Sequence, residues 1–242
     1  MEETYDNMLK RLRMYRLKHG MMQAEFGRLL GMSQAEYSYK ESGKLIISYQ
    51  NLLDFEKAGI NVDFLVTGVD YKYTFPEIEL LFSKCKDYET RELLMKIFAE
   101  ILLYKYKKQI KQENSNTYSA DTNVKNKLEK QPDKGELLEY MLDSWDGFSM
   151  IQYIRNHFGY SQIYMSEKLG MSIKKYRQME RQNIYPDAAM LVDLYNISGY
   201  EPDMFFDKKD RRLIIIEKIW NELRKEERGI LLGVINDTRQ YI

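Results

Sequence analysis

The chain repeats itself, and this internal repeat limits its possible folds more than any other feature. Shifting the sequence by 139 positions superimposes identical residues in the same order over a whole domain length. The matched pairs include Arg16/Arg155, Gly20/Gly159, Gln23/Gln162, Leu30/Leu169, Ser33/Ser172, Tyr37/Tyr176, Glu41/Glu180, Leu52/Leu191 and, with one further residue of offset, Gly59/Gly199 and Asp63/Asp203. An ordered series of this length predicts two copies of one structural unit.

Each copy has the pattern of several short helices. In the first copy, Met8–His19 is amphipathic and ends at Gly20, and a second helix over Gln23–Leu30 stops at Gly31. Ser33 opens a third helix, and Ser33-x-x-Glu36 has the form of a capping box. Only 4 prolines and 13 glycines interrupt the 242 residues, which agrees with a mostly helical chain.

Each copy continues into a predicted helical hairpin, and a polar segment lies between the two copies. Apolar residues recur at helical spacing over Pro76–Leu102 and again over Ile216–Ile235. The polar segment 107–135 cannot bury enough surface to offset chain entropy, so it reads as a linker or a frayed helix end. The predicted divisions are 1–70 (first helical domain), 71–106 (first hairpin), 107–135 (linker), 136–208 (second helical domain) and 209–242 (second hairpin).

Two short helices separated by a Gly-containing turn form a helix-turn-helix. The segment Gln23–Lys44 resembles the DNA-binding motif of the lambda-repressor-like, or XRE/Cro, family, and Gly59–Gly68 resembles the usual end of such domains. Ser161–Asp187 and Gly199–Phe206 carry the same resemblance in the second copy. It implies an all-α fold with two helix-turn-helix domains, each followed by a helical hairpin and joined by a polar linker. It also implies a transcriptional regulator, more often a repressor than an activator.

A helix-turn-helix lays its second helix in the major groove, with the N-terminal residues at the base edges. Residues just after the helix cap, and about six places after it, should therefore point toward DNA. Gln can pair with adenine, Ala can contact the thymine methyl group, and Lys favours guanine or phosphate. The expected contacts in the first copy are Ser33, Gln34, Ala35, Tyr39 and Lys40, and in the second copy Ser172, Ile173, Lys174, Lys175, Arg177 and Gln178. The family resemblance adds phosphate contacts from Gln23, Ser42 and Lys44, and from Gln162, Arg181 and Asn183.

Other residues of the motif have structural interpretations. Tyr37, Tyr176, Leu30 and Leu169 fall on the inward face, and Glu36 reads as a cap rather than a base reader. Glu41 and Glu180 should bond within their own domains. Three positions depart from the family pattern: Met22 lacks a capping hydroxyl, Lys40 stands where an apolar residue is usual, and Gln182 stands where Gly is preferred.

Charge is balanced overall but not along the chain. Lys+Arg and Asp+Glu both number 37, which excludes a histone-like or polybasic protein. Met8–Ile47 nevertheless holds 8 basic and 3 acidic residues, and Gly147–Pro186 holds 6 and 2, so each motif lies in a basic stretch.

The single Cys, Cys85, excludes a disulfide framework and a multi-Cys metal site, and His19 and His157 are isolated. We therefore expect no enzyme activity, no cofactor and no metal. With no apolar stretch near 20 residues, we expect a cytoplasmic protein without a membrane partner.

Double-stranded DNA is the expected partner, together with self-association through the helical hairpins. A homodimer through Leu93–Leu102 or Ile230–Ile235 and an intrachain pseudo-dimer are both allowed. A flexible linker of about 29 residues spans roughly 30 Å, close to the 34–36 Å between half-sites on one DNA face. The alternative function is an antitoxin-like protein-interaction or assembly module, in which one or both helix-turn-helix surfaces bind a protein.

Overall fold

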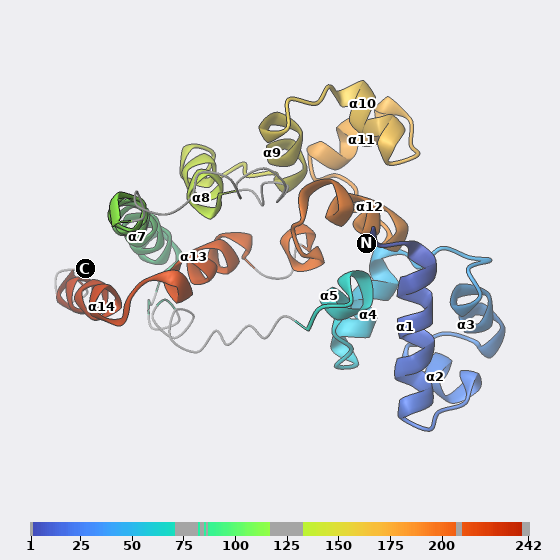
Figure 1. Ribbon diagram of the computed structural model, residues 1–242. Helices are drawn as coiled ribbons and strands as arrows, with labels where there is room; N and C mark the ends of the chain where they lie inside the picture. Colours follow the sequence, from blue (N-terminus) through green and yellow to red (C-terminus); the bar gives the residue numbers. More distant parts are fainter. Residues whose placement is uncertain are drawn as a thin grey trace. The chain divides into compact units, whose positions relative to one another are not determined.

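The structure, a computed structural model, describes residues 2–70, 82, 85, 87–116, 133–206 and 210–238. Within these ranges all regular secondary structure is helical and no strand occurs, so the all-α prediction is confirmed (Figure 1). The chain divides into two compact units, each built from two separate stretches of sequence. Unit 1 comprises Met1–Lys72 and Ser149–Asp207, and unit 2 comprises Tyr73–Phe148 and Lys208–Ile242.

Unit 1 contains both sequence copies as two series of short helices. The first series is α1 (Tyr5–Lys18), α2 (Gln23–Leu29), α3 (Gln34–Glu41), α4 (Tyr49–Lys57) and α5 (Val62–Thr67). The second series is α9 (Met150–His157), α10 (Gln162–Lys168), α11 (Ile173–Glu180), α12 (Ala188–Ser198) and the 3-10 helix η1 (Pro202–Phe205). Members of the two series correspond one to one at the offset of the sequence repeat.

Hydroxyl side chains cap most of these helices, as the sequence predicts. Ser33 Oγ accepts a hydrogen bond from Glu36 N at 3.1 Å, and Ser172 Oγ accepts one from Lys175 N at 3.3 Å. The capping box predicted at Ser33 is incomplete, because the Glu36 carboxylate turns toward Lys40, with 3.6 Å between Oε1 and Nζ. Met22 precedes α2 without a hydroxyl cap, and Glu25 Oε2 accepts a hydrogen bond from Met22 N at 2.8 Å.

Each copy is closed around aromatic and aliphatic side chains that the sequence places on the inward face. Tyr37 and Tyr176 are fully buried, and Leu30 and Leu169 are nearly so. The ring of Phe26 meets Tyr37 edge to face, with 5.1 Å between the ring centroids. Burying these side chains joins α2 to α3, and α10 to α11, into firm helix pairs.

The two copies also contact each other within unit 1. Helix α5 packs against both α12 and η1, and α1 packs against α12. A main-chain hydrogen bond also joins the copies in the described residues, from Ala188 N to Ile47 O at 3.0 Å. The two copies are therefore joined by direct contacts between their helices.

Unit 2 is a bundle of α7 (Tyr88–Asn116), α8 (Lys134–Asp143), α13 (Arg211–Glu222) and α14 (Lys225–Thr238). Helix α7 packs against the other three, and the rings of Phe98 and Trp220 lie 5.7 Å apart in the core. Helices from both predicted hairpins thus share one interior. The Glu92 carboxylate accepts hydrogen bonds from Trp145 Nε1 at 3.0 Å and from the Arg212 guanidinium at 2.6 and 2.9 Å.

Several domain boundaries predicted from the sequence differ from the boundaries of the two compact units. Residues 107–116 of the predicted linker continue α7, whereas 117–132 lie outside the described residues. Helix α8 and residues up to 148 group with unit 2, although the sequence assigns 136–148 to the second helix-turn-helix domain. Of the predicted arm that begins at Pro76, the structure describes Phe82 and Cys85 but not the residues before them, and the hairpin residues 209 and 239–242 also lie outside the described residues. No helix in the described ranges is long and apolar enough to cross a membrane.

Candidate nucleic-acid interface

A buried network of four side chains fixes the helix pair of the first copy. The Glu41 carboxylate on α3 accepts hydrogen bonds from Arg16 Nε at 2.8 Å, from Gln23 Nε2 at 2.7 Å and from Tyr37 Oη at 3.0 Å. Arg16 also donates to Met21 O at 2.7 Å, at the entry to α2. One carboxylate therefore ties together α1, α2 and α3.

The second copy contains the same network at equivalent positions. Glu180 accepts hydrogen bonds from Arg155 Nε at 2.5 Å, from Gln162 Nε2 at 2.6 Å and from Tyr176 Oη at 3.0 Å. Arg155 donates to Tyr160 O at 3.5 Å, which is the counterpart of the Arg16 bond to Met21. The prediction that Glu41 and Glu180 bond within their own domains is confirmed.

Glu41 stays ionised in this network because hydrogen-bond donors surround its carboxylate. Burial alone would raise the pKa of Glu41, but the hydrogen bonds from Arg16, Gln23 and Tyr37 outweigh it and hold the pKa below its usual value. Burial, with the nearby Glu41 charge, raises the pKa of Tyr37, and burial beside Glu180 raises that of Tyr176. The tyrosines stay neutral and donate to the carboxylates.

In the first copy, most predicted DNA contacts lie together on the outside of α3. Gln34 and Ala35 are exposed in its first turn, and Tyr39 is 49% exposed one turn later. Lys44 Nζ lies 5.6 Å from the centroid of the Tyr39 ring, in a cation–π arrangement. Ser42 is exposed at the end of the helix and donates from Oγ to Tyr39 O at 3.2 Å.

Three predicted contacts of the first copy have other surroundings. Lys40 is buried, and its Nζ lies 3.4 Å from Ile46 O, so it does not share the face of Gln34. The Gln23 amide points into the network at Glu41. Ser33 is exposed, but its Oγ is already bonded as the cap of α3.

In the second copy, α11 carries a denser group of cations. Lys174, Lys175, Arg177 and Gln178 are exposed and Ile173 is half-buried. Arg177 Nε donates to Gln162 Oε1 at 3.0 Å, which links α11 to the start of α10. Beyond the helix, Arg181 and Asn183 are exposed, and Ser172 caps the helix as Ser33 does in the first copy.

The turn after α11 contains the departure expected from the sequence. Gln182 has a φ of 59°, and it is the one non-glycine residue with positive φ in the described part of the chain. Its counterpart Gly43 has a φ of 75°. Both copies therefore keep the same left-handed turn after the second helix, although only one has the residue that adopts it without strain.

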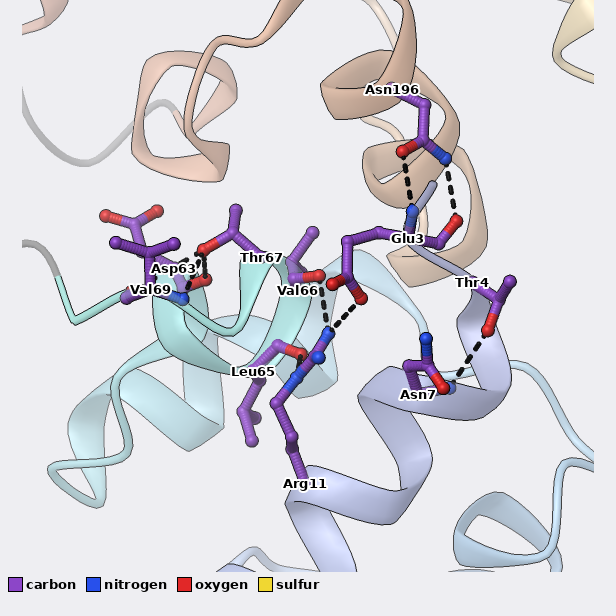
Figure 2. A network of polar contacts seen from close by, with 10 residues as sticks. All are labelled: Glu3, Thr4, Asn7, Arg11, Asp63, Leu65, Val66, Thr67, Val69 and Asn196. Carbon is purple, nitrogen blue, oxygen red and sulfur yellow. Dashed lines mark hydrogen bonds and ion pairs between the residues drawn. The ribbon is translucent and has the colours of Figure 1, made fainter. Parts of the chain in front are cut away.

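The sequence analysis missed a polar cluster at the N-terminus of the chain (Figure 2). Arg11 donates from Nε to Leu65 O and from Nη2 to Val66 O, both at 2.7 Å, and pairs with Glu3 at 2.8 Å. The backbone of Glu3 exchanges two hydrogen bonds with the Asn196 side chain, at 2.9 and 2.7 Å. Neither Arg11 nor Asn196 matches its counterpart in the other copy, so the repeat gave no signal for this cluster.

The arrangement presents two exposed helix faces, one on α3 and one on α11. Among the residues that the structure describes, no group of three or more His, Cys, Asp or Glu is placed to hold a metal ion. No family model, curated protein or solved structure matches the chain. Its function is therefore inferred from these two faces.

Proposed function

We propose that the protein is a sequence-specific DNA-binding regulator of transcription, acting as a repressor, and that α3 and α11 read the major groove. The observation that carries this proposal is the duplicated network around Glu41 and Glu180. It fixes the angle between two short helices in each copy and leaves the first turn of the second helix exposed. Such a helix pair is what a helix-turn-helix reader requires.

The exposed side chains suit both base recognition and phosphate binding. Gln34 can donate to and accept from an adenine edge, and Lys174 can donate to guanine. Lys44, Arg177 and Arg181 surround these readers and can pair with phosphates, which would set the register on the duplex. Both helices begin with uncommitted backbone N–H groups, which attract phosphate.

A binding measurement with one double variant tests the proposal. DNA sites are first selected from a random duplex pool with the full chain, and affinity for the best site is followed by fluorescence anisotropy. Gln34→Ala combined with Lys174→Ala should weaken binding by about 30-fold or more, because each base contact contributes about 1–3 kcal/mol. Gln50→Ala combined with Lys225→Ala removes the same two groups from exposed positions elsewhere and should bind like the parent. Equal affinity of the first variant and the parent would refute the proposal.

A protein-interaction module is the second candidate, and one asymmetry between the copies favours it. In the first copy Met14, Leu17, Met22 and Leu29 are 58%, 56%, 73% and 51% exposed. Their counterparts in the second copy are Tyr153, Asn156, Ser161 and Lys168, of which the last three are polar. Exposed apolar side chains are typical of protein contacts.

Salt dependence separates the two candidates. A DNA reader loses affinity steeply as salt rises from 50 to 200 mM, because bound counterions are released from the phosphates. A protein module would retain no DNA in this range. It would instead lose its partner when Met22 and Leu29 are replaced by Ser and Lys, the residues of the second copy.

A further inference from the structure

The two copies meet through equivalent elements. Helix α5 of the first copy packs against η1 of the second, and Asp203 N donates to Asp63 Oδ1 at 2.9 Å. Asp63 and Asp203 are counterparts in the repeat, and they are only 4% and 7% exposed. Contact between like residues is characteristic of a two-fold interface, in which the same patch is used on both sides.

Aromatic rings extend this interface at the N-terminal ends of α4 and α12, which are equivalent helices of the two copies. Tyr49, the first residue of α4, stacks on Tyr185 at 4.4 Å and on Phe206 at 5.4 Å between ring centroids. Ala188 is the counterpart of Tyr49 and begins α12, where its N–H donates to Ile47 O. The beginnings of α4 and α12 therefore lie close together, as an approximate two-fold relation requires.

One contact of the interface has no symmetric counterpart. Glu3 and Asn196 exchange two hydrogen bonds, and Arg11 holds the Glu3 carboxylate in place (Figure 2). The counterpart of Asn196 is Lys57, which pairs with Asp54 at 2.9 Å instead. The interface therefore suits one first copy joined to one second copy, and it is already filled within a single chain.

The proposed DNA-reading surfaces of the two copies differ in their charge and in their exposed side chains. The segment Ser33–Lys44 holds two basic and two acidic residues, whereas Ser172–Asn183 holds four basic and one acidic residue, a net charge of +3. The exposed readers in the first turn are Gln34 and Ala35 in one copy and Lys174 and Lys175 in the other. The first surface suits A·T pairs and the second suits guanine and phosphate.

We infer that one chain, without a partner chain, reads an asymmetric operator made of two unlike half-sites. The inference rests on the proposed function and names its ligand more closely. The contacts between equivalent elements imply that the half-sites are inverted relative to each other and that the interface fixes their spacing. A homodimer of identical readers would instead select a palindrome.

A fixed interface makes binding sensitive to spacing. Each base pair inserted between the half-sites rotates one of them by about 34° around the duplex. A flexibly linked pair of readers would tolerate such insertions, since its effective concentration changes slowly with distance. Here, one or two inserted base pairs should weaken binding by at least about tenfold.

The test begins with the full chain and a random duplex pool at 50 mM salt. Mass photometry of the complex with the selected DNA counts the chains per site, and anisotropy measures the affinity for sites with zero, one or two inserted base pairs. We expect one chain per DNA, two unlike half-sites and the loss on insertion stated above.

A reader exchange then tests the inverted arrangement. Replacing Gln34→Ile, Ala35→Lys and Tyr39→Gln gives the first copy three of the reading residues of the second, those at positions 173, 174 and 178. All three positions are exposed, so a thermal melt followed by circular dichroism should match that of the parent. The same selection should now return an inverted repeat of the second half-site.

The outcomes distinguish this inference from the proposed function. Two chains on one site, a single half-site, a direct repeat after the exchange or tolerance of inserted base pairs would overturn the inference and leave DNA reading intact. If the parent chain retains no DNA from the pool at 50 mM salt, the proposed function itself fails.

Discussion

At the scale of single residues, the clearest energetic feature is the carboxylate at the centre of each network. Glu41 and Arg16 have side chains only 5% and 8% exposed, and two neutral donors complete the shell of Glu41. Removing one member of a buried ion pair leaves the other charge without compensation, which usually costs more than the pair itself contributes. The network is therefore the place where a conservative substitution should be most damaging.

Glu41→Gln should lower the free energy of unfolding by about 3 kcal/mol at neutral pH, because Arg16 keeps a buried charge without its counterion. The pKa of Glu41 is lower in the folded state, so its contribution is complete above the ordinary value of 4.5 and is lost as the pH falls through the folded value. Urea unfolding of both proteins at several pH values measures this. The difference between them should be constant above about pH 5 and shrink in more acidic solution.

The control for this measurement is Glu36→Gln on the same helix. The Glu36 side chain is 44% exposed, its contact with Lys40 is a long one, and Lys40 Nζ keeps Ile46 O as an acceptor, so the loss of Glu36 should change stability by less than about 1 kcal/mol. A Glu41 variant as stable as this control would contradict the role given to the network.

The left-handed turn after the second helix provides a matched pair of substitutions. Gly43→Gln places a side chain at a φ of 75°, where the new Cβ would also meet Leu9 Cδ1 at 3.2 Å, so we expect a loss of about 1–2 kcal/mol. Gln182→Gly removes this strain in the other copy but makes the unfolded chain more flexible, so it should change stability by less than about 1 kcal/mol. Thermal melts of both variants check the contrast. Equal losses at the two positions would show that the turns are not equivalent.

At the scale of helices, sequence patterns predicted the elements of each copy well, and the exceptions have local causes. The first helix begins at Tyr5 and not at Met8, because Thr4 Oγ1 accepts a hydrogen bond from Asn7 N at 3.2 Å and caps it earlier. Serine and glycine predicted the starts and ends of the helices reliably, because each acts on backbone groups within one helical turn.

Helix α8 was missed for a different reason. It has no counterpart in the first copy, and its buried residues Leu137, Leu138 and Met141 face α7 and α13. Periodicity shows which face of a helix is apolar, but it does not show which distant helix covers that face. For the same reason, the sequence predicted two separate hairpins where the described helices share one bundle.

The caps of α2 and α10 differ, and the difference can be measured. Ser161 Oγ accepts a hydrogen bond from Tyr164 N at 3.1 Å, whereas Met22 offers no such acceptor. Met22→Ser should therefore raise the free energy of unfolding by about 0.5–1 kcal/mol, and Ser161→Ala should lower it by about 1 kcal/mol. Met22→Ala is the control for losing the exposed thioether. Urea melts of the three variants would contradict the assignment if the serine and alanine variants at position 22 were equally stable.

At the scale of the whole molecule, the order of the chain and the grouping of its helices do not coincide. Each unit is completed only when the second half of the sequence is present, since both take one stretch from each half. The repeat predicts the two copies and most of their outward residues, but their direct packing depends on pairs such as Glu3 and Asn196, 193 positions apart. No local pattern encodes a contact between such distant residues.

This arrangement predicts that the two copies unfold together. Phe206 is 2% exposed and stacks on Tyr49 of the other copy, so Phe206→Leu should cost about 1 kcal/mol. Because unit 1 is joined by α5, α12 and η1, the loss should lower hydrogen-exchange protection equally in α1–α4 and α9–α12. Tyr164→Ala, at a 39% exposed position on α10, is the control and should leave protection in the first copy unchanged. If Phe206→Leu lowers protection in α9–α12 alone, the copies are independent domains, and the fixed spacing of half-sites loses its structural basis.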